Sequence, residues 1–255
     1  MLTDSAPSFP DSPLFEEPPV VDTKYGGSLV VFCEVASQLG VDVTEEDRHS
    51  LRVVLGAAMF LDHLLDAVRE DGSSFVSSFV NVVNGELRDD INETVQVRTS
   101  NYMARQQPER QRHIYDQVCA VAELTSRQRE ATNAREVVAI RLAEADILGE
   151  LLRLDYEPGQ SDSDGRNAFN TWVFCWSRVG YTFDSLIDLR RDYKNGEHQV
   201  KATLGAGAIF GTAVIREART ALRQTPLRAM MKCAAIGINY VIRQHRPEVQ
   251  APASA

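Results

Sequence analysis

The sequence contains little that would cross-link or anchor the chain. It has no CxxC pair and no cysteine–histidine cluster, so neither a disulfide framework nor structural zinc is expected. Residues 202–215, one of the longest uncharged stretches, are glycine-rich and fewer than the roughly 20 apolar residues needed to cross a bilayer. The opening MLTDSAPSFPDSP lacks the basic and apolar blocks of a secretion signal. We therefore expect a cytoplasmic protein with reduced thiols and without a membrane span.

Positive charge is also scarce. The 255 residues include 27 lysines and arginines against 36 aspartates and glutamates, for a net charge of −9 at pH 7. A nucleic-acid-binding protein carries a basic surface, so nucleic acid is not an expected partner. Hydrophobic residues make up 44% of the chain, which is enough to form a substantial core. The sequence leaves the oligomeric state open, with a homodimer as one candidate.

Prolines divide the chain. Five of the ten lie in the first 23 residues, which predicts a proline-rich flexible tail over residues 1–23. None occurs between Lys24 and Gln107, and such gaps permit long helices because an interior proline costs a helix about 3 kcal/mol. We expect one helical domain over residues 24–246 and a flexible C-terminal tail over residues 247–255.

Apolar residues between the prolines recur at helical spacing rather than alternating, which predicts an all-α fold. No internal repeat and no alternating βα pattern is visible. Thr44 followed by Asp47 resembles a capping box at the start of one helix. The predicted helices cover residues 25–39, 44–70, 74–84, 86–104, 109–130, 132–156, 165–194, 199–223 and 226–244.

Two rows of carboxylates dominate the chemistry of the sequence. Each row is spaced i, i+4, i+8 in helix-like sequence, so its three acids share one stripe of a helix. The rows are Asp62, Asp66 and Glu70, and Asp184, Asp188 and Asp192. Like charges at this spacing repel, and a hard divalent cation with oxygen ligands removes the repulsion. An acidic row is also typical of a solvated helix face, but both rows are embedded in strongly apolar sequence. We therefore predict that these six residues are metal ligands.

Each row continues into less polar residues on the same side of its helix. At 100° per residue, the face of Asp188 extends back along the helix, and the face of Asp66 does the same. The predicted lining residues are Asn170, Phe174, Ser177 and Tyr181 for the later row, and Leu55 and Met59 for the earlier one. This pattern predicts a pocket with a charged mouth.

The pair of motifs resembles the class I isoprenoid (terpene) synthase superfamily. FLDHLLD stands where that family places its first metal motif, and DSLIDLRRDY with the following NGE is similar to the later motif of squalene and phytoene synthases and of tetraprenyl-β-curcumene synthase-like cyclases. The first motif is DxxxD rather than DDxxD, and no DxDD motif is present. The resemblance implies a single-domain helical bundle with a central cavity and two or three Mg²⁺ ions, with Mn²⁺ as an alternative.

The activity implied by the resemblance is Mg²⁺-dependent ionisation of an acyclic prenyl diphosphate, with conversion of the allylic cation to a terpene and release of diphosphate. Asp62, Asp66, Asp184, Asp188 and Asp192 would be the catalytic metal ligands. Candidate phosphate contacts are Arg178, Arg190, Arg191 and Lys194, with Tyr240 and Arg243 closing the mouth. Arg190 and Arg191 are equally explained as solvent-facing partners of acids on their own helix.

Phe174 and Tyr181 would face the allylic cation.

Three alternative functions stay open from sequence. They are a squalene- or phytoene-type prenyltransferase, an all-α Mg²⁺-dependent nucleotide pyrophosphohydrolase, and a non-catalytic helical interaction protein.

Overall fold

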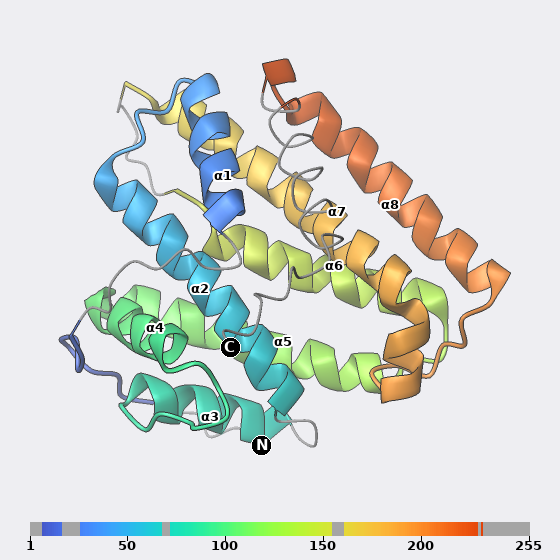
Figure 1. Cartoon of the computed structure of the whole chain (residues 1–255), viewed down its shortest axis with the longest axis horizontal. Coiled ribbons are helices and arrows are strands. Elements are labelled where there is room, and N and C mark those ends of the chain that lie inside the picture. The colour runs from blue at the N-terminus through green and yellow to red at the C-terminus, as the bar shows by residue number, and fades with distance from the viewer. Residues whose placement is uncertain (1–6, 17–25, 68–71, 155–160, 229–230, 232–255) are drawn as a thin grey trace, which may run out of the picture.

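The computed structural model describes residues 7–16, 26–67, 72–154, 161–228 and 231. These residues form eight α-helices and no strand, which confirms the predicted all-α class (Figure 1). The helices are α1 Gly26–Gln38, α2 Glu45–Ala67, α3 Gly72–Val83, α4 Glu93–Arg105, α5 Pro108–Glu130, α6 Ala134–Leu151, α7 Ser163–Asn195 and α8 Leu204–Gln224. None of the described helices is long and apolar enough to cross a membrane.

Two apolar cores hold these helices together, and α7 belongs to both. The larger core joins α1 to α5 with the first part of α7, around Phe60, Phe79 and Trp172. The smaller core joins the end of α5, α6, the second half of α7 and α8, around Leu189 and Phe210. At 1.5 Å per residue, the 33-residue α7 is roughly 50 Å long, which lets it connect the two cores.

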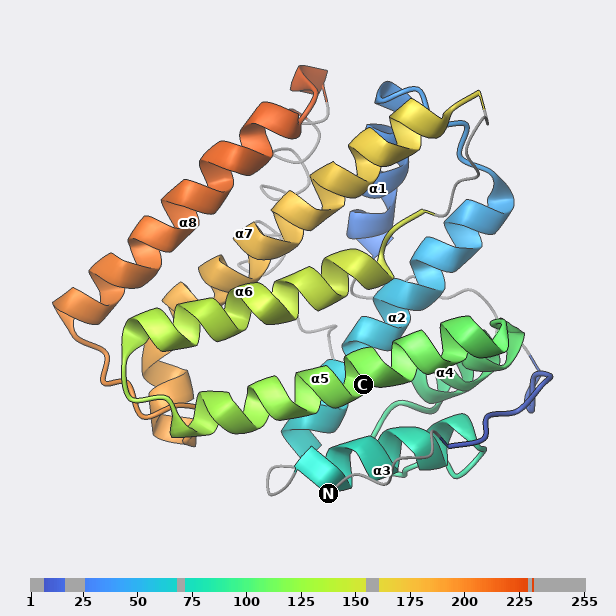
Figure 2. The same cartoon turned by 180° about the vertical axis from the view of Figure 1, so that it is seen from behind.

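The starts of α2 and α7 are joined by ion pairs. The predicted capping box is confirmed, because the Asp47 amide donates to Thr44 Oγ1 (3.1 Å) and the Thr44 amide donates to Asp47 Oδ2 (3.0 Å). The same carboxylate accepts from Arg166 of α7 at 2.9 and 3.0 Å, and Arg166 also donates to Asp162. From this junction both helices run toward the same side of the molecule, as Figures 1 and 2 show.

A left-handed turn ends α7 and redirects the chain. Gly196 has φ 76°, a conformation that favours glycine, and the Glu197 amide donates to the Asp192 carbonyl at 2.9 Å. The chain then runs along the end of α5, where the Gln199 amide donates to the Ala131 carbonyl. The side chain of Thr203 caps the start of α8. The turn therefore folds Glu197 back beside the last turns of α7.

Hydrogen bonds to one hydroxyl fix the end of α8 against α7. Thr225 Oγ1 accepts from the indole N–H of Trp172 at 3.0 Å and from that of Trp176 at 2.8 Å. It also donates to the Ala221 carbonyl in the last turn of α8. The two indoles therefore point away from the carboxylate stripe of α7, as the helical spacing predicts.

Residues 7–16 lie against α4 and α5 without helix or strand. The Asn101 side chain pairs with the backbone of Phe15, and Gln111 donates to the Pro10 carbonyl at 3.2 Å. The ring of Phe9 packs on Tyr115, with centroids 5.9 Å apart. This part of the predicted tail therefore contacts the helical bundle.

Candidate functional site

The earlier carboxylate row lies at the C-terminal end of α2. Asp62 and Asp66 are within the helix, but their side chains, like that of Met59, lie outside the described part of the structure, as does Glu70 entirely. Leu55 is buried in the larger core. The structure therefore gives the position of this row along α2 and leaves its ligand geometry a prediction.

The later row passes from the surface of α7 into the interior. Asp184 is exposed, Asp188 is largely covered, with 19% of its side chain accessible, and Asp192 is only 2% accessible. Residues four apart on a helix turn by about 40°, so the row rotates step by step toward α6. Arg191 pairs with Asp188 at 2.6 Å. The three aspartates therefore occupy three different environments.

Arg141 of α6 is the centre of a charged cluster around Asp192. Its guanidinium donates to Glu144 at 2.9 Å and lies 3.9 Å from Asp192 Oδ2 and 3.8 Å from Glu197. Glu197 reaches this position because of the turn at Gly196. We call the following six residues the acidic cluster: Arg141, Glu144, Asp188, Arg191, Asp192 and Glu197.

The acidic cluster holds four carboxylates and two guanidinium groups, so its acids are incompletely neutralised. Burial and the neighbouring Glu197 raise the pKa of Asp192 to about 6, although Arg141 and Arg191 act in the opposite direction. Burial also raises the pKa of Glu144. Asp192 Oδ1 and Arg141 Nε are both buried without a hydrogen-bond partner among the described residues. A proton or a cation beside Asp192 would reduce the repulsion between these carboxylates and would give the buried oxygen a partner.

Carboxylate oxygens are the ligands that Mg²⁺ prefers, so the donor atoms of the acidic cluster suit that ion. Within the part of the chain that the structure describes, no three carboxylate, histidine or cysteine side chains are already arranged to hold a metal. A metal site here would therefore need further ligands, which the earlier row could supply.

His198 borders the acidic cluster and was not among the predicted site residues. It is 2% exposed, and its Nδ1 accepts from the Val200 amide at 3.2 Å. Burial and the charge of Arg141 lower the pKa of His198, so its ring is neutral at pH 7. The helical wheel of α7 cannot indicate this residue or Glu197, because both follow the turn that ends the helix.

One face of α7 is apolar along much of the helix and passes beside Asp184. On the first half of the helix this face is covered, because Phe32 of α1 packs on Phe169 and Trp172. Ile187 lies five turns beyond Phe169 on the same side, and it is 61% exposed; Phe183 is 51% exposed. A Cβ built on the exposed Gly180 meets no atom of the described residues within 4 Å. The second half of α7 therefore presents an open apolar surface next to the later carboxylate row.

The predicted lining residues of α7 do not lie on this open face, because they are turned toward α6. Asn170 is hydrogen-bonded to the backbone of Leu154 in both directions, and Phe174 packs against Gly149. Ser177 and Tyr181 are half-buried on the same stripe.

The predicted phosphate contacts are in several environments. Arg178 binds Asp146 of α6 through two hydrogen bonds of 2.5 and 2.8 Å. Arg190 and Lys194 are exposed near the end of α7, and Arg191 belongs to the acidic cluster. Tyr240 and Arg243 lie outside the described residues.

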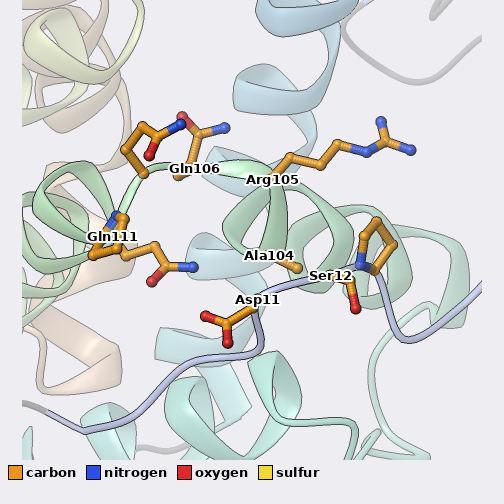
Figure 3. A pocket seen from close by; sticks show the side chains of 9 residues that line it. Asp11, Ser12, Ala104, Arg105, Gln106 and Gln111 are labelled. Carbon is orange, nitrogen blue, oxygen red and sulfur yellow. The ribbon is translucent and has the colours of Figure 1, made fainter.

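A separate groove of about 370 Å³ lies at the corner between α4 and α5, under residues 11–13 (Figure 3). Its lining is mainly polar, but the amide of Gln111 is already bound to the carbonyls of Pro10 and Met103. The groove is at the start of the 23-residue α5, roughly 30 Å along that helix from the loop after α7. It is therefore distinct from the acidic cluster.

Comparisons with protein-family models, with curated proteins and with solved structures gave no match to this chain.

Proposed function

We propose that the protein is a Mg²⁺-dependent class I terpene synthase that ionises an acyclic prenyl diphosphate. One observation carries the proposal. The later carboxylate row starts beside an open apolar face of α7 and ends at a buried, incompletely neutralised cluster, in which one carboxylate oxygen lacks a hydrogen-bond partner among the described residues. A prenyl diphosphate has the same two-part character, an apolar chain and a polyanionic head that binds through metal ions.

The head group would be held at the C-terminal ends of α2 and α7, which lie toward the same side of the molecule. Asp62 and Asp66 would bind Mg²⁺ from one helix, and Asp184, Asp188 and Asp192 from the other. Bound Mg²⁺ supplies neutralisation of the charge that develops on the departing diphosphate. Two arginines lie beside Asp192, Arg191 at 3.6 Å and Arg141 at 3.9 Å. Their planar guanidinium groups suit phosphate oxygens.

The prenyl chain would lie on the open apolar face of α7. Phe183 and Ile187 are exposed there, and the ring of Phe183 can stabilise a carbocation through its face. Phe174 is less suited to this role, because it packs against Gly149 and carries Arg178 over its ring at 5.1 Å. Asn170 is likewise committed to the backbone of Leu154.

The direct test is incubation of the purified protein with geranyl, farnesyl and geranylgeranyl diphosphate in the presence of Mg²⁺. We expect diphosphate release and a terpene product from at least one substrate, with no turnover in excess EDTA. Absence of diphosphate release across the whole panel would overturn the proposal. Consumption of two allylic substrates per product would assign a chain-joining prenyltransferase, and hydrolysis of nucleoside triphosphates alone would assign a pyrophosphohydrolase.

Substitution of one aspartate of the later carboxylate row tests the assigned metal ligands directly. Asp188→Asn removes a charge that the metal site needs, so turnover should fall by about 100-fold or more while the helical circular-dichroism signal stays unchanged. Asp116→Asn makes the same change at an exposed position of α5 and should leave turnover at the wild-type level. Equal activities of the two variants would contradict the role given to Asp188.

A further inference from the structure

The outer side of α8 carries an exposed apolar strip. Leu204 is 95% exposed, Ile215 is 62% exposed and Leu222 is 44% exposed. Spacings of 11 and 7 residues bring these side chains within about 20° of one another on the helix. The opposite side of α8 packs into the smaller core through Phe210 and Ala213. The strip is therefore additional to the apolar surface that the fold uses.

Basic residues form a second strip beside the apolar one. Arg216, Arg219 and Arg223 lie about 40° to 100° around the helix from Ile215, and all three are exposed. Arg219 and Arg223 form no ion pair with an acid in the described part of the chain. The one acid of α8, Glu217, is buried and bound to Arg216 at 2.7 Å. The exposed charge of this helix is therefore entirely positive.

This charge contrasts with that of the whole chain. Residues 199–246 contain eight lysines and arginines and one acid, whereas the complete protein has a net charge of −9. Exposed apolar and basic residues continue past α8 as Leu227, Arg228 and Met231. Figures 1 and 2 show α8 at the edge of the molecule. The basic and apolar strips therefore lie at an accessible margin of the fold.

We propose that the outer face of α8 binds the surface of an anionic lipid bilayer. From Leu204 to Leu222 the apolar strip extends for about 27 Å along the helix, which lets it enter the headgroup boundary in the plane of the surface. The arginine strip beside it is complementary to anionic headgroups. A two-fold dimer through α8 is disfavoured, because it would bring the arginines of both copies together. The helix lies on the membrane and does not span it.

The test is flotation of the full chain with lipid vesicles in EDTA without prenyl diphosphate, so its result is independent of the proposed catalysis. We expect binding to phosphatidylcholine vesicles containing roughly one-third phosphatidylglycerol, and at least about tenfold weaker binding to pure phosphatidylcholine. Salt at about 0.5 M should weaken the binding, because the Debye length falls to a few ångströms. Absence of binding to the anionic vesicles would overturn the proposal.

Two matched pairs of variants locate the surface. Arg219→Glu with Arg223→Glu should weaken vesicle binding by about tenfold or more, whereas Arg112→Glu with Arg127→Glu changes the net charge equally on α5 and should weaken it much less. Ile215→Ser should weaken binding, and Val30→Ser, at a 57% exposed position of α1, should not. Equal losses within either pair would overturn the proposal. So would a wild-type dimer that Ile215→Ser converts to monomers, because the strip would then be a contact between proteins.

Discussion

Asp192 is a buried carboxylate whose charge is poorly compensated. It is 2% exposed, Glu197 and Asp188 both raise its pKa, and one of its oxygens has no hydrogen-bond partner. The two neighbouring guanidinium groups, those of Arg191 and Arg141, lie 3.6 and 3.9 Å from its oxygens, which is too far for a hydrogen bond. A buried carboxylate in this state destabilises the folded protein at neutral pH until a cation or a proton reaches it.

Asp192→Asn should therefore stabilise the metal-free protein. The pKa of Asp192 is raised to about 6, so its contribution to stability is present below about pH 4 and is lost as the pH rises through 6. The neutral variant avoids that loss. We expect its free energy of unfolding at pH 8 to exceed that of the wild type by about 2 kcal/mol. Denaturant titrations in EDTA at pH 4 and pH 8 measure the difference.

Asp116→Asn serves as the control for this measurement, because Asp116 is exposed on α5 and outside the acidic cluster. Its free energy of unfolding should follow that of the wild type at both pH values. A loss of stability in Asp192→Asn at pH 8 would show that the ionised carboxylate is well solvated or well paired.

Within α7, replacement of two glycines by alanine should change the free energy of unfolding in opposite directions. A Cβ on Gly165 would meet the Leu39 carbonyl oxygen at 2.5 Å, whereas a Cβ on Gly180 meets nothing within 4 Å. Gly165→Ala should lower the free energy of unfolding by about 2 kcal/mol, because backbone atoms must move. Gly180→Ala should raise it by about 0.5–1 kcal/mol, because alanine is the better helix former.

Thermal or denaturant unfolding of the two variants beside the wild type measures both effects, and each variant is the control for the other. Destabilisation by Gly180→Ala of the same size as by Gly165→Ala would mean that the second half of α7 is covered. That result would also remove the open apolar surface assigned to the prenyl chain.

Most of the described helices were predictable from sequence, although the helix predicted over residues 86–104 starts only at Glu93 and most of the one predicted over 226–244 lies outside the described residues. The neighbours of each helix face were not predictable. Proline-free stretches and apolar periodicity predicted α5 as residues 109–130 and α7 as 165–194, close to the observed bounds. Periodicity also placed Asn170 and Phe174 on one stripe of α7. It could not predict that α6 packs on that stripe, because the choice of neighbour depends on tertiary contacts far apart in sequence.

The contacts within the acidic cluster were likewise not predictable from helical periodicity. Arg141 and Glu144 form the i, i+3 pair that a solvated helix surface commonly carries, and their spacing cannot indicate that Asp192 and Glu197 approach this pair. Glu197 depends on the turn at Gly196. The carboxylate spacing therefore predicted that the three acids share a stripe of α7, but not that Arg141 of α6 lies among them.

At the scale of the whole molecule, the junction of Asp47, Arg166 and Asp162 sets how α2 and α7 start together. Burial raises the pKa of Asp47, but hydrogen bonds from Arg166 and Thr44 outweigh it and hold the pKa below the ordinary value. The stability it contributes is therefore present above about pH 4 and is lost as the pH falls through the lowered pKa. The junction should make the bundle sensitive to acid.

Asp47→Asn tests this junction. At pH 7 the variant should lose about 2 kcal/mol of unfolding free energy, because Arg166 keeps its partly buried charge with only one of its two carboxylate partners, Asp162. The gap to the wild type should narrow below about pH 4, where the native carboxylate also becomes protonated. Glu46→Gln, at an exposed position in the same first turn, provides the control in the same pH series. A gap that does not change with pH would contradict the role of the charge.

The two tryptophans that bind the Thr225 hydroxyl provide an intrinsic fluorescence probe. The chain has two tryptophans, and both donate to this single oxygen, with ring centroids 6.4 Å apart. Intrinsic ultraviolet emission therefore originates at one place, the seam between α7 and the last turn of α8. Loosening of that seam would shift the emission to the red before the helices melt, whereas changes at the distant α4–α5 corner would leave the spectrum as it was.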